Sequence, residues 1–456
     1  MDARTVLDRL QQQAPFALMV RGAIDWFFEA EFLNALAEQA YQTNYTRDIH
    51  FADLVELLLP VVFQPERTVR SSFRGNPRLA AVATLTSFYG KLNGVDPEVS
   101  RALVRRTAER AAAVLAGRPT VADTLVPGYR LLTLDGNHLA ATERRLDGLS
   151  ACTALPGLGL ILREFTTGLF LDLLPIPDAY AREVSHAPTV LGGTLQASDC
   201  VVADREFCAA GVFDAVEQKQ AFFVIRHRKS VRLHPRTPLR DCHTDAERTV
   251  REQSVGYADG PRVYRAVCVE LARPNRDGDA VITVLTNLPA DIDAQTVADV
   301  YRGRRSIETA FHELAMALQG EVRTLAVPRA ALLCLALAAA VYNLLQVVRH
   351  AIAWEHGPAT AGRLSIQLLC QEVQWHLAGL LVIYEAGKLG PRGDWTAAAV
   401  RAWLCRQAGR IDVGKYQRSR GRKPGSASAG RGRSSRLHES TQRHLDDRAA
   451  RRKKTP

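Results

Sequence analysis

Between residues 129 and 227 the chain alternates short apolar runs with turns and amphipathic stretches, and this order constrains the fold more than any other feature. The runs LLTLD, GLILREF and LFLDLLPI come first, and TTG between the last two is a typical hairpin turn. A helical stretch, the run DCVVADREF, a second helix and the run AFFVIRH follow. This order predicts a layered α/β domain rather than a regularly alternating, doubly wound one.

The regions on either side of this domain have different sequence patterns. Two regions read as mostly helical, with Pro and Gly clusters between the helices, and a third combines short strands with polar turns. We therefore divide the chain into a helical N-terminal region (1–128), the first part of the α/β core (129–227), a β-rich insertion (228–290), the second part of the core (291–325), a C-terminal helical region (326–408) and a basic tail (409–456).

The formal net charge of +11 predicts a polyanionic partner. The 15 basic and 4 acidic residues between Arg410 and Pro456 account for all of this excess. Because this tail is also poor in apolar residues and rich in Gly, Ser and Arg, we expect it to be disordered and to bind nucleic acid nonspecifically. Elsewhere such binding needs local clusters of charge, and Arg226, Arg228 and Lys229 form one beside the fifth predicted strand.

Two features bear on the compartment of the protein. The eight cysteines include no CxxC pair and the first residues are charged and polar, so we expect a cytoplasmic protein. The run 330–348 is apolar and marginally long enough to span a membrane. Its alanine content, its polar Tyr342 and Asn343 and the arginine at each end favour a helix buried in a large soluble domain, with a membrane span as the distant alternative.

Two of the apolar runs end in a carboxylate, Asp135 in LLTLD and Asp204 in VVAD. If these strands are neighbours, both acids meet at one edge of the sheet, where ligand sites of open α/β sheets lie. Carboxylates held close together repel each other unless a cation lies between them, and Mg²⁺ prefers oxygen ligands. Gly136 and Asn137, which follow Asp135, are expected to turn the chain away from this site.

A third acid is expected from a helix that passes the same edge. Tyr301, Arg304 and Glu308 stand at i, i+3 and i+7 and therefore share one helical face. The arginine can hold a phosphate while the acid holds metal, and the tyrosine can donate a hydrogen bond or stack on a base. Together these groups suit phosphodiester chemistry in which two metal ions flank the scissile phosphate.

Each acid taken alone also has an ordinary explanation. The chain holds 48 acidic residues, and the apolar runs around Asp172 and Glu270 include an acid as well. Asp135 could be a turn residue, because Asp-Gly-Asn is a good turn former, and Glu308 could be a solvated helix residue. The hypothesis of a metal site therefore depends on the three acids together.

The segments LTLDGN, VVADREF and YRGRRSIE resemble the three conserved blocks of DDE transposases from bacterial insertion sequences. YRGRRSIE is similar to the helix motif of the Tyr-Arg-Glu-Lys branch, and VLTNLP and GLFLDLLPIPDAYAREV are also typical of it. The resemblance covers roughly residues 125–345. It implies a ribonuclease-H-like catalytic core, split by the β-rich insertion, in which Asp135, Asp204 and Glu308 bind two Mg²⁺ ions, with Mn²⁺ able to substitute.

The same resemblance implies DNA as the partner. Such an enzyme binds the terminal inverted repeats of its element, nicks the element ends with water and joins the freed 3′-OH to target DNA, as a dimer assembled on DNA. We expect the helical region 1–128 to take part in this binding. The residues expected to contact DNA are Tyr301, Arg304, His312, Arg226, Arg228 and Lys229.

The sequence departs from the branch motif at Ala315, where a lysine should follow Glu308 by seven positions. That lysine is expected to contact DNA rather than metal, so its loss bears on the handling of strand ends more than on the chemistry. His312 is the nearest polar candidate on this face. Two alternatives remain: a ribonuclease-H-like nuclease or resolvase that cuts without joining, and a catalytically inert DNA-binding protein derived from a transposase.

Overall fold

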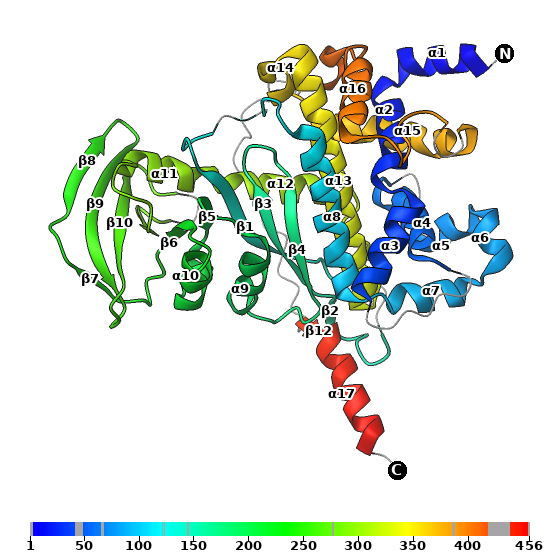
Figure 1. The fold of residues 1–456 in the computed structure, drawn as a ribbon. Helices are drawn as coiled ribbons and strands as arrows, with labels where there is room; N and C mark the ends of the chain where they lie inside the picture. Colours follow the sequence, from blue (N-terminus) through cyan, green and yellow to red (C-terminus); the bar gives the residue numbers. More distant parts are fainter. Residues whose placement is uncertain are drawn as a thin grey trace.

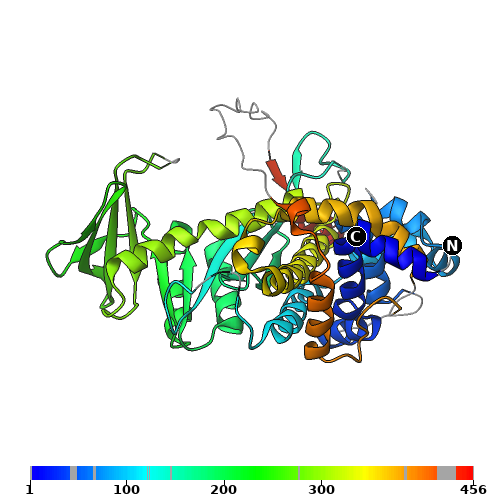
Figure 2. The same ribbon diagram turned by 90° about the horizontal axis from the view of Figure 1, so that it is seen from above.

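The computed structural model shows an elongated molecule with a β-rich end, a central sheet and a helical end (Figures 1 and 2). The described residues are 3–41, 49–64, 68–120, 122, 124–143, 146–275, 278–384, 388–417 and 438–454. The sheet connects the two ends, because strands from the core and from the β-rich region belong to the same hydrogen-bonded ladder.

Ten of the described strands form this mixed sheet, in the order β4-β3-β1-β5-β6-β11-β10-β9-β7, with β8 paired to β9. The expected hairpin is present as β3 and β4, and β3 also pairs antiparallel with β1. Strands β1, β5 and β6 run parallel to each other. The core strands are β1 (Arg130–His138), β3 (Leu158–Glu164), β4 (Phe170–Ile176), β5 (Asp199–Ala203) and β6 (Phe222–Arg226).

Helices cover both faces of the sheet, so the protein is a mixed α/β structure. Because successive side chains of a strand point to opposite faces, Leu132 and Leu134 of β1 belong to the apolar cluster with α9 (Glu183–Thr194) and α10 (Ala210–Glu217). Leu131 of the same strand belongs to the cluster with α11 (Ala294–Gly303) on the other face. The short helix η1 (Arg205–Phe207) follows β5 directly.

The β-rich insertion extends the core sheet instead of forming a separate sheet. Its last strand pairs antiparallel with β6, with Val284 opposite Arg226. The chain then returns along α11 and α12 (Arg305–Met316), which run from the insertion toward the helical end (Figure 2). The insertion strands are β7 (Leu233–Pro235), β8 (Arg240–Thr244), β9 (Arg248–Tyr257), β10 (Val263–Leu271) and β11 (Val281–Thr286).

The helical end combines the N-terminal and C-terminal regions around α13 (Pro328–His356). The N-terminal helices are α1 (Ala3–Gln13), α2 (Pro15–Phe27), α3 (Ala30–Ala40), α4 (Phe51–Val62), α5 (Val69–Arg74), α6 (Pro77–Val82), α7 (Leu85–Asn93) and α8 (Pro97–Leu115). The remaining C-terminal helices are α14 (Pro358–Gly362), α15 (Ile366–Ile383), α16 (Ala397–Ala408) and the short η2 (Val413–Tyr416).

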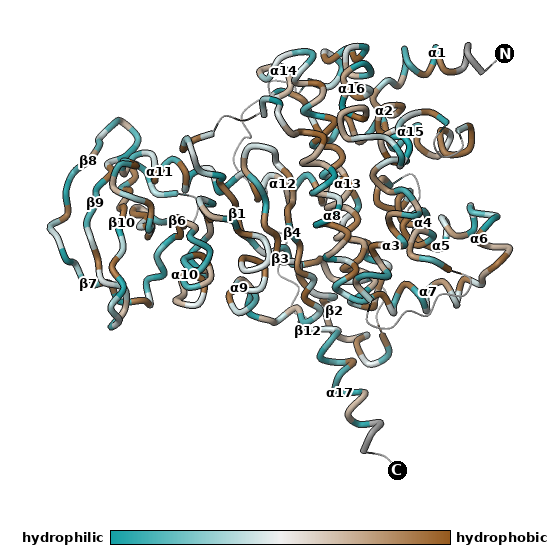
Figure 3. Tube along the Cα trace, viewed as in Figure 1, coloured by the Kyte–Doolittle hydropathy of each residue, from teal (hydrophilic) through white to brown (hydrophobic). Residues whose placement is uncertain are grey.

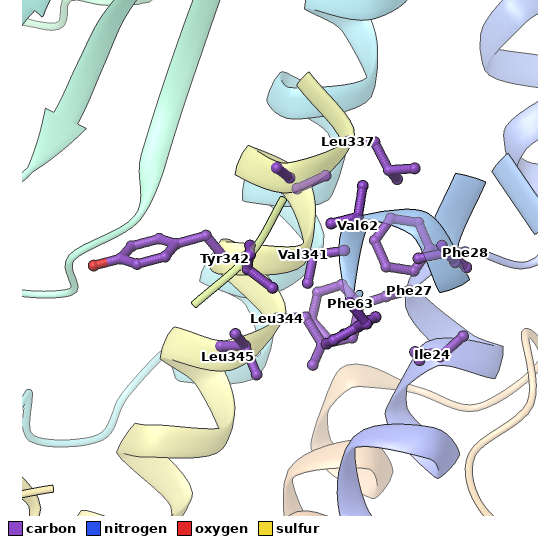
Figure 4. Close-up of a cluster of buried hydrophobic side chains, with 14 of the residues drawn as sticks. Ile24, Phe27, Phe28, Val62, Phe63, Leu337, Val341, Tyr342, Leu344 and Leu345 are labelled. Atoms are coloured by element: carbon purple, nitrogen blue, oxygen red, sulfur yellow. The ribbon is translucent and has the colours of Figure 1, made fainter. Parts of the chain in front are cut away.

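Helix α13 contains the apolar run for which the sequence left a membrane span as an alternative. Among the described residues, α13 and α15 are long and apolar enough to cross a membrane, but the apolar stretch of α13 is entirely enclosed. Val341 and Leu344 meet Phe27 and Phe63 of the N-terminal region (Figure 4). On the other side, the ring of Tyr342 lies 4.8 Å from that of Phe170 in β4. The run is therefore a central core helix, and neither helix indicates a membrane protein.

The expectation of a wholly disordered tail is wrong for residues 409–417 and 438–454. Residues Val413–Tyr416 form η2, and Ile411 and Tyr416 are buried. Strand β12 (His438–Ser440) pairs parallel with β2 (Thr153–Leu155), and α17 (Thr441–Lys454) follows it. The composition of a segment indicates only whether it can form a hydrophobic core of its own. Strand β12 is instead held by backbone hydrogen bonds to β2. Helix α17 is predominantly hydrophilic and projects from the body (Figure 3). Residues 418–437 of the predicted tail lie outside the described residues.

Candidate active site

Asp135 and Asp204 come together because β1 and β5 are neighbouring parallel strands. The paired register ends with Leu134 opposite Ala203, so the next residue on each chain is one of the two acids. Asp204 also caps η1, since its Oδ1 accepts a hydrogen bond of 2.8 Å from the backbone N–H of Glu206. The structure thus brings both carboxylates to the carboxyl-terminal edge of two parallel strands.

The turn expected after Asp135 is wrong. Strand β1 continues through Gly136 and Asn137 to His138, because β3 supplies pairing partners beyond the point where β5 ends. Asp135 therefore projects from within a hydrogen-bonded strand, and its side chain is 20% exposed. A carboxylate on a continuous ladder is held in a fixed direction, which a turn residue would not be.

Arg304 connects Asp135 to the third predicted acid. Its Nη1 lies 3.3 Å from Oδ2 of Asp135, and its Nη2 donates to Oε1 of Glu308 at 2.5 Å. The expected single helix is interrupted, because Arg304 is the residue between α11 and α12. The side chain of Glu308 is 54% exposed, and Tyr301 lies on α11 near Arg304. All three residues of the predicted helix motif thus lie beside the two strand-end acids.

The electrostatics of the site disfavour additional negative charge. Burial raises the pKa of the Asp135 carboxyl to about 6, although the Arg304 guanidinium opposes this shift. The charges of Asp204 and Glu308 contribute to the raised pKa as well. Asp204 and Glu308 therefore lie close enough to Asp135 to repel its carboxylate, and a cation between these acids would remove that repulsion.

Glu183 is a fourth carboxylate at this edge, and the sequence reasoning did not identify it. It is the first residue of α9, and its side chain is 20% exposed. A Cβ atom at Gly136 would lie 2.2 Å from Cδ of Glu183, so only glycine admits this carboxyl group. Burial, together with the charges of Asp135 and Asp204, raises the pKa of Glu183 to about 7. The available signal was Gly136 itself, because glycine inside a strand marks a close approach.

Substituting Gly136→Ala should displace the Glu183 carboxyl group, since the clashing atoms are the end of a flexible side chain. We expect the free energy of unfolding to fall by about 1 kcal/mol, and this loss to disappear in a Glu183→Ala background. Urea unfolding of the four proteins of this double-mutant cycle measures the coupling. Gly192→Ala on α9, where an added Cβ meets no atom within 4 Å, is the control. If Gly136→Ala lowered the free energy of unfolding equally with Glu183 and with Ala at position 183, the contact between Gly136 and Glu183 would be contradicted.

The chemistry of the donor set fits a divalent cation. Asp135, Asp204 and Glu183 present carboxylate oxygens, the ligands that Mg²⁺ prefers. Burial, and to a lesser extent the negative charge of Asp204, raises the pKa of Asp135 and of Glu183, and a cation at this edge would oppose both effects. Within the described part of the chain, no three His, Cys, Asp or Glu side chains are arranged to hold a metal ion. Arg304 occupies the space between Asp135 and Glu308, so Glu308 would have to leave Arg304 to join such a site.

The predicted basic cluster is largely neutralised by acids distant in sequence. Asp279 lies 2.5 Å from Arg226 and 3.7 Å from the exposed Lys229. Arg228 lies 3.8 Å from Glu206. Arg226 also interacts with Tyr301, which connects the cluster to the helix motif. The cluster is therefore near the site but has less free positive charge than its sequence suggests.

The other predicted contacts lie on α12 beyond Glu308. His312 is exposed, four residues after Glu308, and Ala315 is exposed as well. The surface that would carry the motif lysine is therefore open to solvent.

The central segment of the chain matches a known protein family. Residues 132–344, a little under half of the chain, match the family model described as "Transposase DDE domain". No curated protein matches the chain. The matched segment begins in β1, ends in α13 and includes Asp135, Asp204 and Glu308. The match supports a DDE transposase family and a transposase function in general, with DNA as the partner and a nucleotidyl-transferase type of reaction. This family generally uses divalent metals.

Proposed function

We propose that the chain is a DDE transposase of the Tyr-Arg-Glu-Lys branch, which binds the ends of a bacterial insertion sequence, cleaves them and transfers them to target DNA. The observation that carries this proposal is the meeting of Asp135 and Asp204 beside the Arg304–Glu308 pair, within the matched segment. Acids that can hold metal and a guanidinium that can hold phosphate are the groups that phosphodiester transfer requires.

The order of strands supports a ribonuclease-H-like core. The antiparallel strands β4, β3 and β1 are followed in the sheet by the parallel strands β5 and β6. Helix α9 connects β4 to β5, and α10 connects β5 to β6. The insertion enters after β6 and leaves before α11, so it separates the glutamate helix from the two aspartates in sequence but not in space.

Asp135, Asp204 and Glu308 are the residues that we propose to hold two Mg²⁺ ions, with Mn²⁺ able to substitute. When bound, such ions supply Lewis acidity to a phosphoryl oxygen and lower the pKa of water. Arg304 can exchange its carboxylate partners for phosphate oxygens, because a guanidinium makes charge-assisted, bidentate hydrogen bonds to either group. Tyr301 can stack on a base or hydrogen-bond to the strand.

The proposed reaction has two steps. Water attacks phosphorus at the element end, the bond from phosphorus to the 3′ oxygen breaks, and a free 3′-OH remains. This hydroxyl attacks a target phosphodiester, and a target 3′-OH leaves with the proton. Arg304 lies between Asp135 and Glu308, so its guanidinium can stabilise charge that develops on phosphoryl oxygens held there, and charge stabilisation of this kind is usually the largest contribution to such catalysis.

The other predicted contacts belong to the same proposal. Inverted repeats engage the N-terminal helical region, while His312, Arg228 and Lys229 contact the backbone near the site. The basic tail adds nonspecific attraction. Two copies assemble on the paired element ends in the cytoplasm, since joining requires both ends.

Labelled DNA from the flanks of the reading frame tests this function. With the full chain and Mg²⁺, we expect cleavage at the element end and, with pre-cut ends, a joined product. EDTA should abolish both. Cleavage without joining would indicate the nuclease or resolvase alternative, and binding with neither reaction would indicate the inert DNA-binding protein.

A further inference from the structure

A cleft of ≈ 1060 Å³ opens between the insertion and the glutamate helix. One wall consists of residues from α11, Arg304 and α12, including Tyr301 and Glu308. The other wall is formed by the start of β9, the end of β10 with the loop that follows it, and β11. Because Glu308 lines this cleft, the cleft leads directly to the candidate active site.

Six arginines and two glutamates line the cleft, which gives the lining itself a formal charge of 6 − 2 = +4. Three of the arginines have acidic partners: Arg226 pairs with Asp279, Arg248 with Asp299 at 2.8 Å, and Arg304 with Asp135 and Glu308. The remaining three are exposed and form no ion pair in the described part of the chain. These are Arg273, Arg302 and Arg305.

The three unpaired arginines lie on both walls of the cleft. Arg302 lies in the last turn of α11, Arg305 begins α12, and Arg273 follows β10 on the insertion. An exposed guanidinium gains little from distant acids in water, so these groups are available to an anionic ligand. Positive groups on two facing walls suit a chain of phosphates that runs between them.

The lining of the cleft also offers surfaces for bases. Val269, Leu271 and Ile282 contribute apolar side chains, and Tyr301 contributes an aromatic ring. Arginines beside an aromatic ring and apolar surface are the combination that holds single-stranded nucleic acid, with phosphates on the cations and bases on the ring. The volume lies just above the range of roughly 300–1,000 Å³ for small-ligand pockets. It admits a few nucleotides of one strand rather than the width of a duplex.

We propose that this cleft binds a short unpaired segment of the DNA strand next to the cleavage site, with phosphates on Arg273, Arg302 and Arg305 and bases against Tyr301 and the apolar wall. This inference rests on the proposed transposase function and deepens it, because it names the form of DNA that this side of the site holds. It also moves the main phosphate contact from the ion-paired cluster at 226–229 to the three unpaired arginines.

Fluorescence anisotropy with two labelled probes tests the proposal: a blunt duplex, and the same duplex with a short single-stranded extension. The full chain carries Asp135→Asn, so that binding is measured without cleavage. Replacing Arg273, Arg302 and Arg305 together by Gln should weaken binding of the extended probe at least about tenfold and lower its salt slope by about 2, at ~0.7 per phosphate contact. The affinity for the blunt duplex should change less than about threefold.

Arg232, Arg236 and Arg240, exposed arginines of the insertion that do not line the cleft, provide the matched control. Their triple Gln variant removes the same charge and should leave the preference for the extended probe intact, and a triple Lys variant of the cleft should restore most of the salt slope. Equal losses for both probes, a control as weak as the cleft variant, or tighter binding of an RNA extension would overturn the inference. Cleavage by the unmodified chain in Mg²⁺ tests the proposed function separately, so either can fail alone.

Discussion

Asp135→Asn, Asp204→Asn and Glu308→Gln should each lower the rate of Mg²⁺-dependent DNA cleavage about 10³-fold or more. Each change removes one carboxylate charge without changing the side-chain shape. Loss of a group that holds a catalytic metal costs several kcal/mol of transition-state stabilisation, and each ~1.4 kcal/mol is tenfold in rate. Gel-shift affinity for the same DNA should stay within about threefold, because most of that affinity comes from contacts with the phosphate backbone.

Glu270→Gln is the matched control for this experiment. Glu270 also follows apolar residues in a strand, but its side chain is 53% exposed on β10 and lies 3.2 Å from Arg251. We therefore expect a normal cleavage rate for this variant. The assignment of the triad fails if two of the three site variants keep near-normal strand transfer.

The acids show what the sequence could predict and what it could not. Asp135, Asp172 and Glu270 all stand in apolar runs, and local pattern does not separate them. Strand pairing separates their positions: Asp135 lies where the parallel ladder with β5 ends. Asp172 is fully buried in an ion pair, and Glu270 lies near the surface. The three acids are proposed as a triad because three separated segments together, in their order along the chain, resemble the blocks of one family. No single apolar run would indicate them.

The parts of the site that were missed depend on long-range contacts. Glu183 approaches Gly136 through a contact between the start of α9 and β1, which are 47 residues apart in sequence, and the glycine instead suggested a turn. The basic cluster at 226–229 seemed free because Asp279, which pairs with Arg226, lies about 50 residues later. Conversely, Arg302 and Arg305 lie between residues of the helix motif, but the sequence does not show that they face the insertion across a cleft.

The largest expected effect on stability concerns the buried ion pair between Arg101 and Asp172, which joins α8 to β4. Two N–H groups of Arg101 donate to the Asp172 carboxylate at 3.0 and 2.8 Å, and the side chains are 9% and 0% exposed. Thr194 at the end of α9 donates a further hydrogen bond of 3.1 Å to the same carboxylate. The pair therefore holds α8 of the helical end against β4, the strand at the edge of the sheet.

Arg101→Met should lower the free energy of unfolding by about 3–5 kcal/mol, because it leaves the Asp172 carboxylate buried without its cation. The double variant Arg101→Met/Asp172→Leu should recover most of this loss, since replacing a buried pair by apolar groups is often nearly neutral. Arg106→Met is the control on the same helix: its pair with Glu109 is also 2.8 Å long but is more than half exposed. That variant should cost about 1 kcal/mol or less. Urea unfolding compares the four proteins, and a double variant less stable than Arg101→Met would show that the pair is not what joins the two regions.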